Sequence, residues 1–182
     1  AYAFITYYTA YLKAQYPEEF YCELLNNSIN NTDKIFIILS EISSQNIEVI
    51  PPDINISDSR FTINENKILY GLSALKGVGE ESMIELVSNR KEKGVYKSLV
   101  DFNKRLSRSV LNKRQIEKLI LSNSFKSIHK DISELFSNVE TIIQKKDENS
   151  LFIDEDDTQF FLNKKIIKID QIDAEFESYG FL

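Results

Sequence analysis

The residues best suited to bind a ligand form a short stretch in the middle of the chain, Lys76-Gly77-Val78-Gly79. Glycines on both sides of an apolar residue favour a tight turn, because glycine adopts backbone angles that side chains forbid. Val78 is expected to point inward, and the following helix would present unpaired backbone N–H groups at its start. Such groups bind a phosphate without reading sequence, and Lys76 adds positive charge beside them. The alternative is an ordinary tight turn between two packed helices.

A second, degenerate unit of the same kind follows the first. A short helix over residues 102–106 leads into a turn that contains Arg108, and Asn112 can cap a helix that begins with Lys113 and Arg114. Two adjacent hairpins of this type would grip both strands of a duplex through phosphate contacts, which position a protein but carry no sequence information. An ordinary basic helix face explains the same residues equally well.

The distribution of charge supports an anion-binding middle. Residues 1–66 carry 3 basic and 9 acidic side chains, residues 67–130 carry 14 and 6, and residues 131–182 carry 5 and 13. The net charge of -6 therefore conceals a basic block between two acidic ones. Three solvated surfaces that happen to cancel are the alternative interpretation.

The composition excludes several classes of site. One cysteine rules out an internal disulfide or a multi-cysteine zinc site, and one histidine rules out a histidine pair. Cys22 is expected to be a buried thiol, and spacing suggests no catalytic partner for His129. No run of 18 apolar residues is present, which excludes a membrane-spanning helix. We therefore predict no catalytic residue, no metal site, no cofactor and no membrane partner for this segment.

The hydrophobic pattern predicts a mainly α fold: a helical bundle with two hairpin units and one small β-hairpin. Helices are expected over residues 2–16, from Pro17 to the polar run that begins at Asn26, over residues 80–91, and from residue 128 to about residue 144. A further helix is expected from a cap at Thr32 or Asp33 through Ile42. The aromatic residues of the first helix are expected to be core. Residues 60–63 and 67–70 are predicted to form two strands, and residues 47–50 an extended segment before Pro51-Pro52. An apolar helix beginning at residue 1 suggests a piece of a longer protein.

The chain resembles the family of bacterial replicative DNA polymerase III alpha subunits. The resemblance is colinear over nearly the whole chain and weaker over residues 128–170. It is carried by the following stretches, of which the second is highly specific: residues 3–20 (AFITYYTAYLKAQYPEEF), 47–55 (IEVIPPDIN), 70–80 (YGLSALKGVGE), 96–102 (YKSLVDF), 110–114 (VLNKR) and 177–182 (ESYGFL).

The resemblance implies three parts. Residues 1–58 would be the last helices of the fingers region. Residues 59–127 would be a β-hairpin plus tandem helix-hairpin-helix motifs that bind duplex DNA. Residues 128–182 would be a helix, an acidic linker and a C-terminal helix. The palm carboxylates that hold two metal ions (Mg²⁺ for the parent polymerase) would lie upstream, so the segment should not polymerise alone. Replisome subunits as partners and a cytoplasmic location follow from the same resemblance.

The family often carries a sliding-clamp-binding peptide, of the form Gln-x-x-Leu/Met-Phe, in the linker after the hairpins. The corresponding residues here are Glu148-Asn149-Ser150-Leu151-Phe152. Leu151 and Phe152 suit an apolar pocket, whereas Glu148 cannot donate the hydrogen bonds of an amide. We therefore expect a weakened clamp motif.

Three functions are compatible with these observations. The first is a non-catalytic, DNA-binding segment of a replicative polymerase. The second is a free-standing helix-hairpin-helix adaptor that bridges DNA and a protein. The third is a structural interaction module that makes no contact with DNA.

Overall fold

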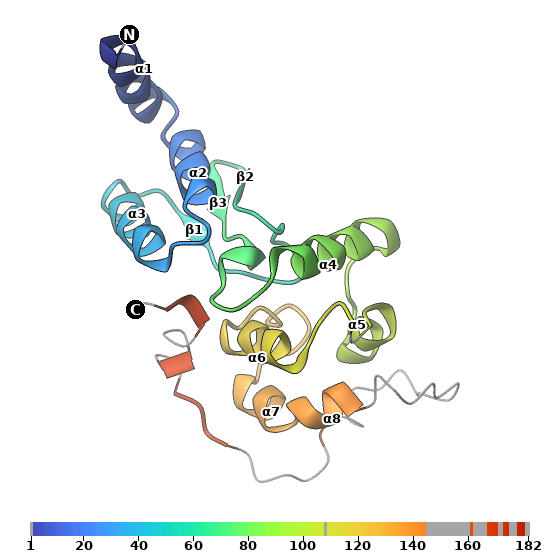
Figure 1. The fold of residues 1–182 in the computed structure, drawn as a ribbon. Helices are drawn as coiled ribbons and strands as arrows, with labels where there is room; N and C mark the ends of the chain where they lie inside the picture. The colour runs from blue at the N-terminus through green and yellow to red at the C-terminus, as the bar shows by residue number, and fades with distance from the viewer. Residues whose placement is uncertain are drawn as a thin grey trace.

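The computed structural model describes residues 2–107, 109–144, 161, 167–170, 173–174 and 178–180. Helices dominate these residues, and a small sheet lies between the third and fourth α-helices (Figure 1). The α-helices are α1 (Tyr2–Gln15), α2 (Pro17–Asn27), α3 (Thr32–Ser44), α4 (Glu80–Lys93), α5 (Leu99–Arg105), α6 (Lys113–Leu121), α7 (Ile132–Ser137) and α8 (Val139–Gln144). A 3₁₀ turn, η1 (Leu72–Ala74), precedes α4. The mainly α fold class is confirmed.

The sheet has three strands in the order β1-β3-β2, comprising β1 (Val49–Ile50), β2 (Thr62–Asn64) and β3 (Lys67–Leu69). Strands β2 and β3 form the expected antiparallel hairpin. Glu65 and Asn66 at its turn both have positive φ, as a two-residue hairpin loop favours. The extended segment before Pro51 adds a strand parallel to β3, a pairing that the sequence did not predict.

Helix α1 differs from the expectation of a core helix, because all of its described residues are exposed (Figure 1). Its exposed apolar side chains include Phe4, Tyr7, Tyr8 and Tyr11, which recur at spacings of three and four residues and contact one another along one side of the helix. The contacts of α1 are with α2 and, through the ion pair between Lys13 and Glu41, with α3. Periodicity identified the helix but could not show whether another element covers it.

Two helix boundaries also differ from expectation. Helix α3 is capped by Asn31 instead of Thr32 or Asp33, and the side chain of Asn31 accepts a hydrogen bond from the N–H of Lys34 at 3.0 Å. The single helix expected over residues 128–144 is two short helices, α7 and α8, which are separated at Asn138. At this position the side-chain amide of Asn138 donates to the carbonyl of Glu134 at 2.9 Å, a local hydrogen bond of the kind that competes with regular helix.

The segment after β1 joins the sheet to the helices that follow it. Asn55 exchanges two hydrogen bonds with the backbone of Tyr96, both at 2.8 Å. The carboxylate of Asp53, which is almost fully buried, accepts from the N–H and the hydroxyl of Ser127 at 3.0 and 2.8 Å. The segment that contains Pro51 and Pro52 thus holds both the loop before α5 and the loop after α6 against the sheet.

One continuous apolar cluster includes residues from α2 through α8. Its largest fully buried members are Tyr21, Tyr96, Phe61, Phe102 and Phe125. Cys22 is buried in the same cluster, as expected, and burial raises the pKa of its thiol, with a further contribution from Glu23 and Glu19. Within the described part of the chain, no helix is long and apolar enough to span a membrane.

Candidate nucleic-acid interface

The first hairpin runs from η1 through Gly77 into α4. Gly77 has φ of +82°, a left-handed conformation that disfavours any side chain. Val78 is buried, and its N–H donates to the carbonyl of Leu75 at 3.1 Å. Met83 and Leu86 on the inner face of α4 are completely buried. The inward position predicted for Val78 is confirmed, and with Met83 and Leu86 it packs the turn against the core.

Gly79 has a role in packing that was not predicted from the sequence. Its φ of -80° and ψ of 137° are ordinary extended values, so the expectation of forbidden backbone angles is wrong at this position. A Cβ atom at Gly79 would lie 3.1 Å from Nε2 of Gln115 in the second hairpin. The missing side chain therefore makes room for a neighbouring helix.

The second hairpin connects α5 to α6 and ends in a complete capping box. The side chain of Asn112 accepts from the N–H of Gln115, and the side chain of Gln115 accepts from the N–H of Asn112, both at 3.0 Å. Asn112 is thus the helix cap that the sequence predicted. Lys113 and Arg114 follow it as the first two residues of α6, while Arg108 lies outside the described residues.

The two helix starts lie next to each other. Nε2 of Gln115 donates to the hydroxyl of Ser82 in the first turn of α4 at 3.1 Å. A Cβ atom at Gly77 would lie 3.5 Å from Nε of Arg114, so the guanidinium group of Arg114 covers the first turn. The structure thereby brings together Gly77, Gly79, Arg114 and Gln115 from the two hairpins. Gln115 was missed from the sequence, although its position three residues after Asn112 matched a capping box.

Lys76 and Lys113 lie on either side of this junction and are both exposed. The backbone N–H of Lys76 donates to the carbonyl of Ser178 at 2.8 Å, which joins the hairpin to the C-terminal segment. Nζ of Lys113 lies 2.9 Å from Oε1 of Glu140 in α8 and 3.9 Å from Oε1 of Glu117. The hydrogen bond with Glu140 raises the pKa of Lys113.

A further basic residue, Arg60, approaches the start of α4. Its Nε donates to Oε1 of Glu80 at 2.6 Å, and this hydrogen bond raises the pKa of Arg60. The sequence analysis missed Arg60 because it precedes β2, far along the chain from Gly77. Glu80 is a residue that would repel a phosphate if left unpaired, and the ion pair offsets its charge.

The sequence also draws attention to His129, Leu151 and Phe152. Leu151 and Phe152 are outside the described residues. His129 does have a carboxylate partner, contrary to expectation, because its Nε2 lies 3.1 Å from Oε2 of Glu134. The spacing of five residues concealed this pair, since the partners are separated by the turn that starts α7.

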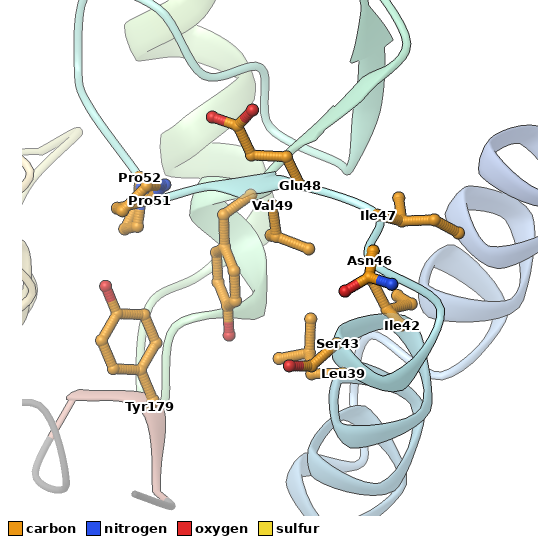
Figure 2. A pocket seen from close by; sticks show the side chains of 11 residues that line it. Leu39, Ile42, Ser43, Asn46, Ile47, Glu48, Val49, Pro51, Pro52 and Tyr179 are labelled. Carbon is orange, nitrogen blue, oxygen red and sulfur yellow. The ribbon is translucent and has the colours of Figure 1, made fainter.

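An apolar groove opens elsewhere, between α3, the β1 segment and Tyr179 (Figure 2). Its walls include Leu39, Ile47 and Pro51, and none of the described side chains that line it is basic. The groove is therefore unsuited to bind a phosphate, and the hairpin junction is the better candidate for an anion site.

Known proteins are similar to this chain in the region of the two hairpins and beyond it. A family profile described as helix-hairpin-helix motif matches residues 46–135. DNA polymerase III subunit alpha of Buchnera aphidicola is 37% identical over 150 residues, which is 82% of this chain and 13% of the relative. The Deinococcus radiodurans subunit is 42% identical over 125 residues, and the Borreliella burgdorferi subunit 37% over 161.

This chain belongs to the DNA polymerase III subunit alpha family. It spans about 13% of the length of the DNA polymerase III alpha subunits that it matches. The resemblance seen in the sequence is confirmed, and the profile match includes both hairpins as well as the sheet.

The contact between the hairpins yields a prediction about stability. Ser82→Ala removes only the acceptor for Gln115 and should lower the free energy of unfolding by about 0.5–1 kcal/mol. Gln115→Ala also removes half of the capping box and should cost about 1–2 kcal/mol. Urea unfolding followed by circular dichroism measures both changes.

Gln45→Ala is the matched control, because Gln45 is an exposed residue at the end of α3. Its effect should stay within about 0.5 kcal/mol. Equal, small effects for all three substitutions would contradict the role assigned to Gln115.

Proposed function

We propose that this chain is an interior segment of a replicative DNA polymerase and that it holds duplex DNA by its backbone phosphates. The observation that carries the proposal is the junction of two helix starts, linked by Gln115 and Ser82, with Arg114 across the first turn. Backbone N–H groups at helix starts favour anions, and α4 has no side-chain cap from Gly79 to compete for them.

The proposed binding is independent of sequence. The apolar residue of the first turn, Val78, is buried and cannot reach a base edge. The remaining groups at the junction are backbone amides, lysines and arginine, which suit phosphate oxygens. Such contacts position a protein on a duplex and leave base reading to other groups.

The chemical step belongs elsewhere in this proposal. Polymerases of this family use Mg²⁺ ions held by carboxylates, and the described residues gather no group of three or more His, Cys, Asp or Glu side chains that could hold a metal. We place the carboxylates that hold these ions upstream of this segment, as the resemblance to the family implies. The segment contributes to synthesis by holding DNA.

The alternative of a free-standing adaptor is less well supported. Each of the relatives named above is a much longer polypeptide of which the matched part is a minor share. In the proposed arrangement, residues 1–58 complete the fingers region, and cytoplasmic replisome subunits act as partners through the rest of the polymerase.

The test is binding of mixed-sequence duplexes to the 182-residue chain at several salt concentrations. The logarithm of affinity should fall linearly with the logarithm of salt, with little difference between sequences. Lys76→Gln and Arg114→Gln should each reduce the magnitude of the slope by about one, because each removes one phosphate contact.

Lys93→Gln is the matched control, since Lys93 lies at the opposite end of α4. It should leave the slope unchanged. Three results would contradict the proposal: binding that does not depend on salt, a strong preference for one duplex sequence, or an equal reduction of the slope with Lys93→Gln.

We also propose that residues 148–152 form a weak binding peptide for a sliding clamp. The support is the sequence alone: Leu151 and Phe152 supply the apolar anchors, while Glu148 replaces the glutamine that the motif prefers. Titration of a clamp with a peptide of residues 144–156 should give weak, saturable binding, and Glu148→Gln should strengthen it. Unchanged affinity for the double variant Leu151→Ala, Phe152→Ala would refute the motif.

A further inference from the structure

The backbone of Arg60 packs directly against Gly71. A Cβ atom at Gly71 would lie 2.5 Å from the carbonyl carbon of Arg60, so only glycine permits this approach. The neighbouring Phe61 exchanges two hydrogen bonds with the side chain of Asn26, both at 2.9 Å. The loop therefore cannot shift without breaking contacts on both sides.

The segment before Arg60 is also bonded to the residues that lead into the first hairpin. The N–H of Leu72 donates to the carbonyl of Asp58 at 3.0 Å, and the N–H of Ser73 donates to the carbonyl of Ser59 at 2.9 Å. Arg60 is consequently positioned by the same 3₁₀ turn that positions Gly77. Its location relative to the hairpin is a property of the packed structure.

The side chain of Arg60, in contrast, is open to a ligand. It is 55% exposed, and among the described residues its carboxylate partner is Glu80, the first residue of α4. That bond uses Nε, and a guanidinium group has four further N–H donors on its two terminal nitrogens. These donors lie beside the helix start and have the planar fork that suits phosphate oxygens.

We infer that Arg60 donates to the backbone phosphate bound at the start of α4, and is a third basic residue at this helix start beside Lys76 and Arg114. The inference rests on the proposed function. Glu80 then serves to orient the guanidinium group, and Arg60 removes the repulsion that Glu80 would exert on the phosphate.

A simpler role for Arg60 would be to neutralise Glu80 without touching DNA. The two roles differ in what happens when both partners are removed. Arg60→Gln together with Glu80→Gln restores the net charge of the unaltered chain, but it does not restore a lost phosphate contact. Comparing the single and double variants therefore separates direct contact from neutralisation.

The experiment measures binding of a mixed-sequence duplex to the full 182-residue chain against salt. We expect Arg60→Gln to weaken binding about fivefold to tenfold at about 0.1 M salt and to reduce the slope by about one. The double variant should keep the reduced slope. Lys67→Gln is the control, because Lys67 is likewise a basic residue with a carboxylate partner, Glu48 at 2.9 Å, and its side chain is 43% exposed, but it lies on β3.

The other possible outcomes show whether the Arg60 contact alone fails or the proposed function fails with it. An unaltered slope with Arg60→Gln, or a slope restored by the added Glu80→Gln, refutes the phosphate contact of Arg60 and leaves the proposed function standing. An equal loss of duplex affinity with Lys67→Gln refutes the phosphate contact of Arg60 as well. If the unaltered chain shows no salt-dependent binding of duplex, the proposed function fails and this inference fails with it.

Discussion

The hydrogen bond from Gln115 to Ser82 determines how the two hairpins are placed relative to each other. Gln115 closes the cap of its own helix with one end of its amide and reaches the neighbouring helix with the other. The absence of a side chain at Gly79 leaves space for this approach, and Gly77 has a left-handed conformation in the turn before it. The starts of α4 and α6 form one surface because the buried side-chain amide of Gln115 makes hydrogen bonds at both.

That surface depends in turn on how the hairpins are held against the sheet. Asp53 and Asn55 bind the loops on either side of the second hairpin, and Arg90 of α4 donates to the carbonyl of Ile54 at 2.6 Å. Buried carboxylate and amide groups whose hydrogen bonds are satisfied allow little freedom of movement. A phosphate-binding junction of this kind is preorganised, so ordering it on binding should cost little free energy.

The features that could be predicted from sequence are those that depend on local chemistry. The hairpin at Gly77, the inward position of Val78 and the cap at Asn112 each follow from a few neighbouring residues. The features that were missed depend on contacts between distant residues. These include the parallel pairing of β1 with β3, the approach of Arg60 to Glu80, and the exposure of α1. A helical period shows that a side of α1 is apolar, but burial depends on what packs there.

The most direct test of the account is a titration of the ¹⁵N-labelled chain with a short mixed-sequence duplex, followed by amide chemical shifts. The account predicts that the largest shifts occur in two groups, at residues 77–82 and 112–116, and that both groups change together as duplex is added. They should also diminish together as salt is raised. Shifts confined to one hairpin, or concentrated on α1 and the apolar groove with neither hairpin affected, would contradict the claim that the two helix starts form one phosphate-binding surface.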